Sequence, residues 1–264
     1  MSMNKTDFIL LFALLICFSS VCAQEYYTDT CYRRHIGGEI GITNFFGDDN
    51  NKSIERLRES KSSDRGYYYD KYYGDNEDFT MVYAGAKVEQ IFGRYPQFGI
   101  SSGLRLSMSF ASLHSPDNSD FFWLLKEEGT TTDYVRLKSF SEHSFFVGIP
   151  VELRYLLSRR PRVFQTYFKI GAVANFRIAT ANSVKFSNQS MSKYEKEICS
   201  QIKPDGIFNL MVNPAFGFKI GRNCNPLANL EFQVPFFAYG AKNVSSLIYP
   251  EAGMNFNISL QFPF

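Results

Sequence analysis

The chain has 264 residues, of which 45% are hydrophobic, yet its mean hydropathy is −0.20. It contains 27 Phe, 16 Tyr and one Trp, and its 28 basic and 26 acidic side chains give a formal net charge of +2. This near-balance excludes a nucleic-acid-binding domain that works by bulk positive charge, and the aromatic content excludes an intrinsically disordered chain. After the first residues no apolar run reaches 18 residues, which excludes a bundle of membrane-spanning helices.

Residues 1–23 have the pattern of a secretory signal peptide. The apolar segment Phe8–Phe18 has the length of an h-region, and Val21 and Ala23 occupy the −3 and −1 positions of a cleavage site. We therefore predict a signal peptide at 1–23 and one exported domain at 24–264, outside the cytoplasm of a bacterium.

Eight segments of the exported part alternate apolar and polar residues, as strands with two unlike faces do. The clearest runs from Phe98 to Phe110, with large apolar residues at most even positions and Gly, Ser or Arg at odd ones. The predicted strands are 33–43, 79–91, 98–110, 144–157, 164–178, 208–220, 229–236 and 252–264.

The links between these strands alternate in length. Long links at 44–78, 112–143, 181–206 and 239–251 alternate with short ones at 92–97, 158–162 and 222–227. Surface loops at one end and tight turns at the other are typical of an up-and-down barrel. The predicted fold class is all-β: an eight-stranded antiparallel up-and-down transmembrane β-barrel with long extracellular loops.

The nature of the two faces distinguishes two kinds of eight-stranded barrel. A soluble lipocalin-like barrel turns its apolar face inward, whereas an outer-membrane barrel turns it to lipid and has a polar interior. Here the polar face mixes glycine with ions of both signs, which suits a narrow interior better than a solvated surface. We therefore predict an outer-membrane barrel whose lumen holds Glu39, Lys87, Glu89, Arg105, Glu152, Arg154, Lys169, Arg177, Lys219 and Glu231.

The last strand carries the most specific signal in the chain. Its apolar residues share one face and end on an aromatic residue, as in the terminal strand that the bacterial barrel-insertion machinery reads as an exposed edge. We predict this insertion signal at Phe256, Ile258, Leu260, Phe262 and Phe264.

Two further strands carry a family resemblance. The run Phe145–Tyr155 (FFVGIPVELRY) and the following Tyr167–Gly171 (YFKIG) resemble the "IPxxLRY" and "YxxxG" strands of the PorT-like outer-membrane β-barrel family of Bacteroidetes-type bacteria. The resemblance covers essentially the whole exported part and implies an eight-stranded outer-membrane barrel. Its motifs are structural and transfer no catalytic residue, and some relatives serve protein secretion.

The lumen charges have two interpretations. They could line an ion path or ligand pocket, or they could pair into a plug, because unpaired charges in a confined interior are costly. Eight strands leave an interior just wide enough for side chains, so we favour the plug over a general-diffusion porin.

The three histidines, His35, His114 and His143, raise the question of a lipid-modifying enzyme. Neighbours on a strand face opposite sides, so His143 and Ser144 are poorly placed as a base and a nucleophile. We interpret the histidines as loop or interface residues and predict no catalytic residue.

The first long loop contains a tyrosine cluster: Tyr67, Tyr68, Tyr69, Tyr72 and Tyr73. Such a cluster can form a binding surface for sugar or protein, since each ring offers apolar area with a polar tip. It can equally belong to an aromatic girdle or pack over the barrel mouth.

Removal of the signal peptide leaves three cysteines. Cys31 precedes the first strand and Cys224 lies in a short link, so both belong to the same barrel end and are a candidate disulfide. Cys199 lies in an outer link and would be the odd thiol. The chain has no zinc-type Cys/His spacing, and we predict no metal and no cofactor.

The predicted function is non-enzymatic binding, or a part in assembly or secretion, through the outer loops. The expected partners are outer-membrane lipid, the insertion machinery and an unidentified surface ligand or secretion partner, with no nucleic acid. A small porin or specific uptake channel is the alternative, and a lipid-modifying enzyme is a third.

Overall fold

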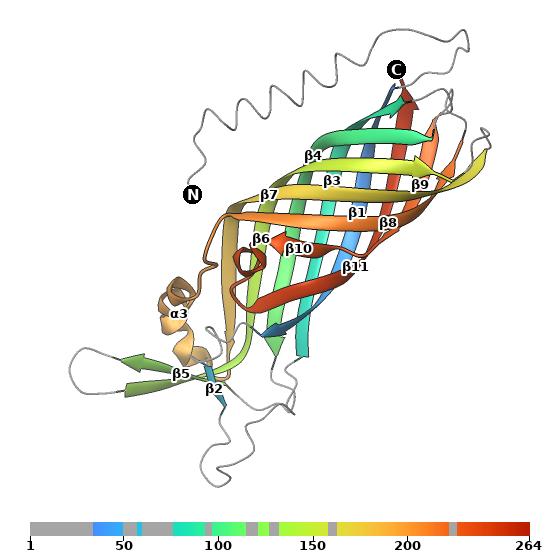
Figure 1. The fold of residues 1–264 in the computed structure, drawn as a ribbon. Helices are drawn as coiled ribbons and strands as arrows, with labels where there is room; N and C mark the ends of the chain where they lie inside the picture. Colours follow the sequence, from blue (N-terminus) through green and yellow to red (C-terminus); the bar gives the residue numbers. More distant parts are fainter. Residues whose placement is uncertain are drawn as a thin grey trace, which may run out of the picture.

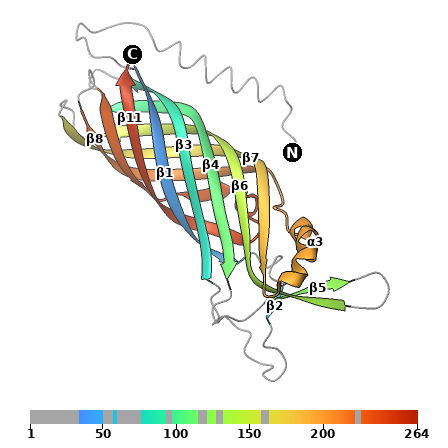
Figure 2. The same cartoon turned by 180° about the vertical axis from the view of Figure 1, so that it is seen from behind.

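Antiparallel strands close into a ring in the computed structural model of the chain (Figures 1 and 2). The structure describes residues 34–49, 57–59, 76–92, 97–114, 121–126, 132–157, 163–221 and 226–264. Eight strands, called staves below, form the wall of the barrel, and β9 and its continuation β10 count as one stave. The staves are β1 (Arg34–Asp49), β3 (Asn76–Phe92), β4 (Phe98–His114), β6 (Thr132–Leu156), β7 (Phe164–Phe186), β8 (Phe208–Ile220), β9 (Leu227–Gln233) with β10 (Phe236–Tyr239), and β11 (Ile248–Pro263).

Pairing of the first and last staves closes the barrel. β1 pairs with β3 on one side and with β11 on the other, from His35 opposite Pro263 to Asp49 opposite Ile248. All the pairings between the described strands are antiparallel. The predicted eight-stranded antiparallel up-and-down barrel is therefore confirmed.

Several staves continue beyond the predicted strands at the long-loop end. β6 and β7 are the longest, and β5 (Phe121–Lys126) folds back on β6, while β2 (Leu57–Glu59) pairs with β5. We call β2, β5 and residues 132–144 and 179–186 of β6 and β7 the outer extension; β5 projects from the barrel in Figure 1.

The predicted link 181–206 is also more ordered than expected. It contains the end of β7, the 3₁₀ helix η1 (Gln189–Tyr194) and the helix α3 (Glu195–Gln201). Among the described residues, no helix is long and apolar enough to cross a membrane.

One predicted strand, 229–236, is interrupted between β9 and β10. The register with β8 is the same on both sides of the break, with Gln233 opposite Ala215 and Phe236 opposite Val212. Pro235 lies at the break and Pro214 opposite it, and neither can donate a backbone hydrogen bond. Their carbonyls still accept, Pro214 O from Val234 N at 2.9 Å and Pro235 O from Gly253 N at 2.8 Å, so the strand stays hydrogen-bonded to both of its neighbours across the break.

The interior is filled by side chains in two zones along the barrel axis. Buried polar and charged residues occupy the half nearer the short turns, and a buried apolar cluster occupies the half nearer the long links. The second zone differs from the uniformly polar lumen that alternation predicts.

Candidate functional site: a filled lumen and an outer extension

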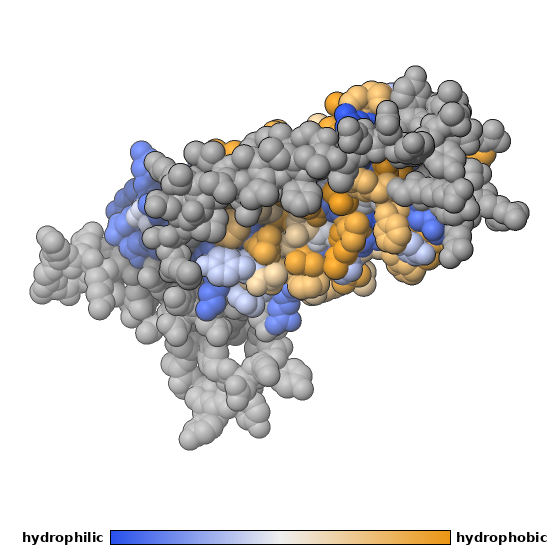
Figure 3. All heavy atoms as spheres, turned by 45° about the horizontal axis from the view of Figure 1, so that its top comes forward, coloured by the Kyte–Doolittle hydropathy of each residue, from blue (hydrophilic) through white to orange (hydrophobic). Residues whose placement is uncertain are grey.

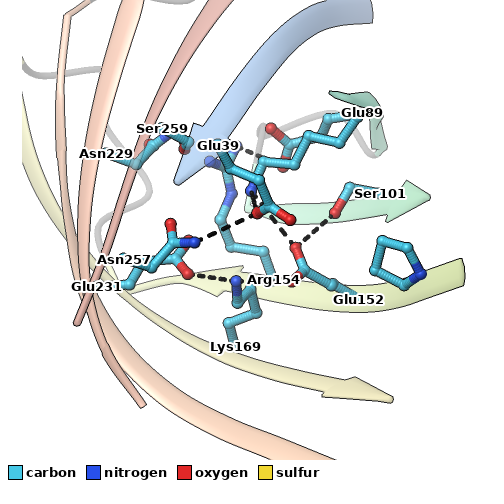
Figure 4. A network of polar contacts seen from close by, with 12 residues as sticks. Glu39, Glu89, Ser101, Glu152, Arg154, Lys169, Asn229, Glu231, Asn257 and Ser259 are labelled. Atoms are coloured by element: carbon cyan, nitrogen blue, oxygen red, sulfur yellow. Dashed lines mark hydrogen bonds and ion pairs between the residues drawn. The ribbon is translucent and has the colours of Figure 1, made fainter. Parts of the chain in front are cut away.

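A network of ions fills the centre of the polar half (Figure 4). Glu152 on β6 lies 2.9 Å from Lys169 Nζ and 3.5 Å from both Lys87 Nζ and an Arg105 guanidinium nitrogen. Glu39 on β1 lies 2.6 Å from Arg105 and 3.3 Å from Lys87. Lys169 also pairs with Glu231 on β9. Three acids and three cations from six staves thus neutralise one another in a confined space.

A smaller group of charges lies nearer the short turns. The Arg154 guanidinium and the Glu89 carboxylate are 2.8 Å apart, and Lys219 donates a hydrogen bond to Gln165 Oε1 at 3.2 Å. His35 is fully buried at the same end of β1. Nine of the ten charged residues proposed for the lumen are therefore buried inside the barrel.

Arg177 is the exception. It lies opposite Phe146 at an irregularity in the β6–β7 register, beyond the ion network, and is only half-buried. Phe146 is buried, so its register partner Arg177 keeps the inward-facing side that alternation predicts; the extra residue of β7 comes after it, between Arg177 and Ala179.

Tyrosines and amides fill the space around the ions. The Tyr83 ring lies under the Arg105 guanidinium, 4.0 Å from its carbon to the ring centroid, and Asn257 donates to the Tyr83 hydroxyl at 2.8 Å. The Tyr167 hydroxyl donates to Glu231 at 2.7 Å. Both rings lie against glycines, since an added Cβ at Gly41 or Gly217 would meet the facing tyrosine ring. The glycines of the polar face therefore provide room for large lumen side chains.

The apolar half of the lumen is closed by a segment that was predicted to be an outer loop. Within the predicted link 239–251, residues 240–247 form the lumen loop, which contains the 3₁₀ helix η2 (Ala241–Asn243). Val244, Ser245 and Leu247 are fully buried, and Val244 and Leu247 join a cluster with Phe146 on β6. The prediction of an outer loop here was wrong, because the outer half of the barrel interior offers apolar side chains that the loop covers.

A buried carboxylate holds the lumen loop. Glu142 on β6 is 1% exposed and accepts hydrogen bonds from the backbone N–H of Ser246, at 3.0 Å, and from its hydroxyl. Sequence reasoning missed this contact; the only signal was the apolar residues Val244, Leu247 and Ile248 within a supposedly exposed loop.

Helix α3 packs against the outer extension. Its Ile198 is fully buried in the same apolar cluster as Phe140 of β6 and Val184 of β7. Asn182 of β7 donates to the carbonyl of Ile202 at 2.7 Å, and the Cys199 thiol donates to the carbonyl of Asn182 at 3.6 Å. The extension and its helix are thus continuous with the packed interior of the barrel.

The histidines do not assemble a catalytic arrangement with the adjacent serine. His143 is half-buried against the Phe110 ring, 5.2 Å between centroids, whereas Ser144 is fully buried and bonds the Thr180 hydroxyl at 2.9 Å. The two side chains lie on opposite faces, as alternation predicts. Within the described part of the chain, no three His, Cys, Asp or Glu side chains gather as a metal site would require.

Some candidate residues lie outside the described residues. Cys31, Cys224 and the tyrosine cluster of the first loop (Tyr67, Tyr68, Tyr69, Tyr72 and Tyr73) are among them. The Cys31–Cys224 disulfide stays a prediction, which a comparison of gel mobility with and without reductant tests.

The outer surface of the barrel carries the apolar residues. On β6 they begin at Phe145, which is 42% exposed, and they end at Leu157, directly after the strand, which is 45% exposed. The segment between these two residues is longer than the about 9–11 residues that a tilted strand needs to cross a bilayer. Figure 3 shows such residues gathered along the side of the barrel. We call this surface the apolar belt; it includes Ile36, Ile40, Ile42, Leu104, Leu106, Ile170, Ile178, Ile258 and Leu260.

Aromatic pairs border the belt at both ends. Phe98 and Tyr155 lie 4.9 Å apart between centroids at the short-turn end, and Phe176 and Phe208 lie 5.2 Å apart toward the long loops. Exposed large apolar side chains over a buried ionic interior are stable only in lipid, and an apolar band between aromatic girdles is the surface of outer-membrane barrels. The chain is an outer-membrane β-barrel protein. Its short turns face the periplasm and its long loops and outer extension face outward.

The terminal strand contributes to the belt. The five residues of the predicted insertion signal all lie on the lipid-facing side of β11 or directly after it, between 37% and 55% exposed: Phe256, Ile258, Leu260, Phe262 and Phe264.

Comparisons with known proteins found only distant likenesses. No family model and no curated protein matches it. Among solved structures, the outer-membrane protein OprG from Pseudomonas aeruginosa is 9% identical with a TM-score of 0.42, covering 89% of this chain and 97% of that one. The N-terminal β-barrel domain of Pseudomonas aeruginosa OprF is 9% identical (TM-score 0.30, 88% and 100% covered). Ail of Yersinia pestis is 8% identical with a TM-score of 0.26, covering 88% of this chain and 99% of that one. These likenesses are too distant to assign a role.

Proposed function

We propose that this outer-membrane protein is a non-enzymatic component whose barrel is an anchor and whose outer extension and loops bind a partner, in surface binding or in assembly or secretion. The observation that carries the proposal is the filled lumen. An ion network occupies its periplasmic half, and the lumen loop with its apolar cluster occupies the outer half. A protein that works by conduction needs a continuous polar path, and the apolar half interrupts one.

The size of the outer extension supports the second part of the proposal. β6 continues from its lipid-facing segment to Thr132, and β5, β2, α3 and η1 pair with or pack on this protruding sheet. A rigid platform outside the membrane is a suitable base for binding loops. The resemblance of Phe145–Tyr155 and Tyr167–Gly171 to the PorT-like family supports a link to secretion, and membership of that family belongs to the proposal.

Two further expectations belong to the same proposal. Residues 1–23 are removed on export, which leaves a barrel domain at 24–264. The insertion machinery recognises the strand that ends at Phe264. N-terminal sequencing of the protein from outer membranes tests the first, and a substitution described below tests the second.

Single-channel recording in planar bilayers tests the proposal that the barrel is an anchor and does not conduct ions. The wild-type barrel is expected to give no stable conductance steps, because both halves of its lumen are packed. A variant that lacks residues 241–247 opens the outer half and serves as the comparison, with insertion of both proteins verified by heat-modifiable gel mobility. Large, stable steps from the wild-type barrel would establish the pore instead.

A further inference from the structure

Exposed cations gather on the outer extension. Arg136 and Lys138 of β6 and Lys185 of β7 are all exposed. Residues 135–144 and 179–186 contain a single acid, Glu142, which is buried on the opposite face and bonded to the lumen loop. The exposed charge of these two strand segments is therefore entirely positive.

Backbone pairing brings the three cations close together. Lys185 is in register with Ser139, which is next to Lys138, and the β6–β7 register shifts between Leu137 and Ser139. On its other side, β6 pairs with β5, where Arg136 is in register with Phe122. Like charges on neighbouring strands, as at Lys138 and Lys185, destabilise a sheet, so an anionic ligand between these two lysines is favourable.

This cationic face is continuous with the lipid-facing exterior of the barrel. Along β6, the exterior residues run from Phe145 through His143 and Ser141, and the irregularity near Ser139 then shifts the exterior to Lys138 and Arg136. Along β7, the exposed residues Ala179, Ala181 and Ser183 lead to Lys185 in the same way. The cations therefore stand above the membrane on the side of the wall that lipid covers below.

The distance of the cations from the apolar belt indicates which kind of anionic ligand can reach them. Lys138 is seven residues beyond Phe145, the last apolar-belt residue of β6. At about 3.3 Å per residue and a tilt of about 45°, this is about 16 Å above the belt. The headgroups of simple phospholipids extend only about 5–7 Å from the hydrocarbon. A lipid with several saccharides in its headgroup reaches the cations.

We propose that this face binds the acidic oligosaccharide headgroup of an outer-leaflet glycolipid, through phosphate groups on its saccharides. Lysine and arginine side chains are the usual partners of phosphate oxygens. The inference rests on the proposed function, because it names a ligand class for the outer extension. One glycolipid would then contact both surfaces, the apolar belt with its acyl chains and the outer extension with its headgroup.

Glycolipid binding by the purified full-length barrel tests this proposal. The probes are a lipopolysaccharide with a phosphorylated oligosaccharide, the same lipid after removal of its oligosaccharide, and the free phosphorylated oligosaccharide without acyl chains. The wild-type protein is expected to bind the first most tightly. Since each cation near an anionic surface strengthens binding about fivefold, K138Q/K185Q is expected to lose about 25-fold in affinity at low salt.

A double variant of equal charge change is the control. Lys196 and Lys203 are also exposed, on and after α3, and K196Q/K203Q is expected to bind the glycolipid as the wild type does. Equal loss in both variants, no loss in K138Q/K185Q, or equal binding of the lipid without its oligosaccharide would overturn the proposal. Equally tight binding of the free oligosaccharide would also overturn it, in favour of a soluble polyanion. None of these results depends on conductance, so the two proposals fail separately.

Discussion

The Glu142 carboxylate accepts the backbone N–H of Ser246 at 3.0 Å inside the outer half of the barrel, although the two residues are 104 apart in sequence. The same carboxylate accepts the Ser246 hydroxyl. A loop between β10 and β11 would ordinarily extend into water. Here its polar backbone is satisfied by a buried acid while Val244 and Leu247 join the core, so the loop belongs to the interior.

Removing this acid should release the lumen loop. We expect Glu142→Ala to lower the free energy of unfolding by about 3 kcal/mol, since it removes hydrogen bonds to a charged acceptor and leaves a buried donor unsatisfied. Urea unfolding in vesicles measures the loss, and chymotrypsin cleavage after the buried Leu247 reports release of the loop. The exposed Glu197 provides the control Glu197→Ala; unchanged unfolding and cleavage in Glu142→Ala would contradict the assigned contact.

The ion network should be most sensitive at Glu152, which contacts three cations. We expect Glu152→Gln to destabilise the barrel by about 3–5 kcal/mol, because it leaves buried positive charges without their counter-charge. The temperature at which gel mobility changes on heating measures the effect. Glu251→Gln, at an exposed position, should leave that temperature unchanged; equal shifts in both variants would show that the network adds nothing.

Two glycines of β1 lie in different surroundings: Gly41 packs against a lumen side chain, whereas Gly38 has free space beside it. A Cβ at Gly41 would lie 2.3 Å from the Tyr83 ring, whereas the nearest atom to a Cβ at Gly38 is 3.7 Å away. We expect Gly41→Ala to cost about 1–3 kcal/mol through overpacking and Gly38→Ala to cost little. Unfolding in the same vesicles compares them, and similar values would mean that the Tyr83 ring moves aside freely.

The Cys199 thiol should react slowly with alkylating agents. Burial raises its pKa, and the nearby Glu195 carboxylate raises it further. The thiolate is the reactive form, so a raised pKa lowers the rate at neutral pH and moves its rise to higher pH. The rate of alkylation by iodoacetamide, measured in a C31S/C224S variant over about three pH units around the usual thiol pKa, gives this pH profile. A rate that rises at or below the pKa of free cysteine would contradict the raised pKa of Cys199.

The terminal aromatic residue should matter for insertion more than for lipid contact. We expect Phe264→Ser to reduce the amount of folded barrel in outer membranes, because it removes the end of the strand that we propose the insertion machinery recognises. Phe46→Ser removes a comparably exposed ring from β1, 61% against 54%, and should reduce that amount less. Heat-modifiable gel mobility of membrane fractions provides the measurement, and equal losses would count against an insertion signal at Phe264.

Much of the fold follows from local pattern. The period of two in segments such as Phe98–Phe110 predicts both a strand and its lipid-facing side, because successive residues of a strand point to opposite faces. The exposed Leu104 and Leu106 beside the buried Arg105 agree with this. Where a strand gains an extra residue, as directly after Arg177, the period fails, since a bulge depends on the partner strand.

By itself, the sequence determined an eight-stranded barrel with apolar residues outward and ions inward, since both features depend only on alternation along each strand. Tertiary structure decided which ions meet, because Glu39, Glu152 and Glu231 come from staves far apart in the chain. It also decided that residues 240–247 turn into the lumen. Whether a loop is buried depends on the space and apolar surface that the closed barrel leaves, which no local pattern contains.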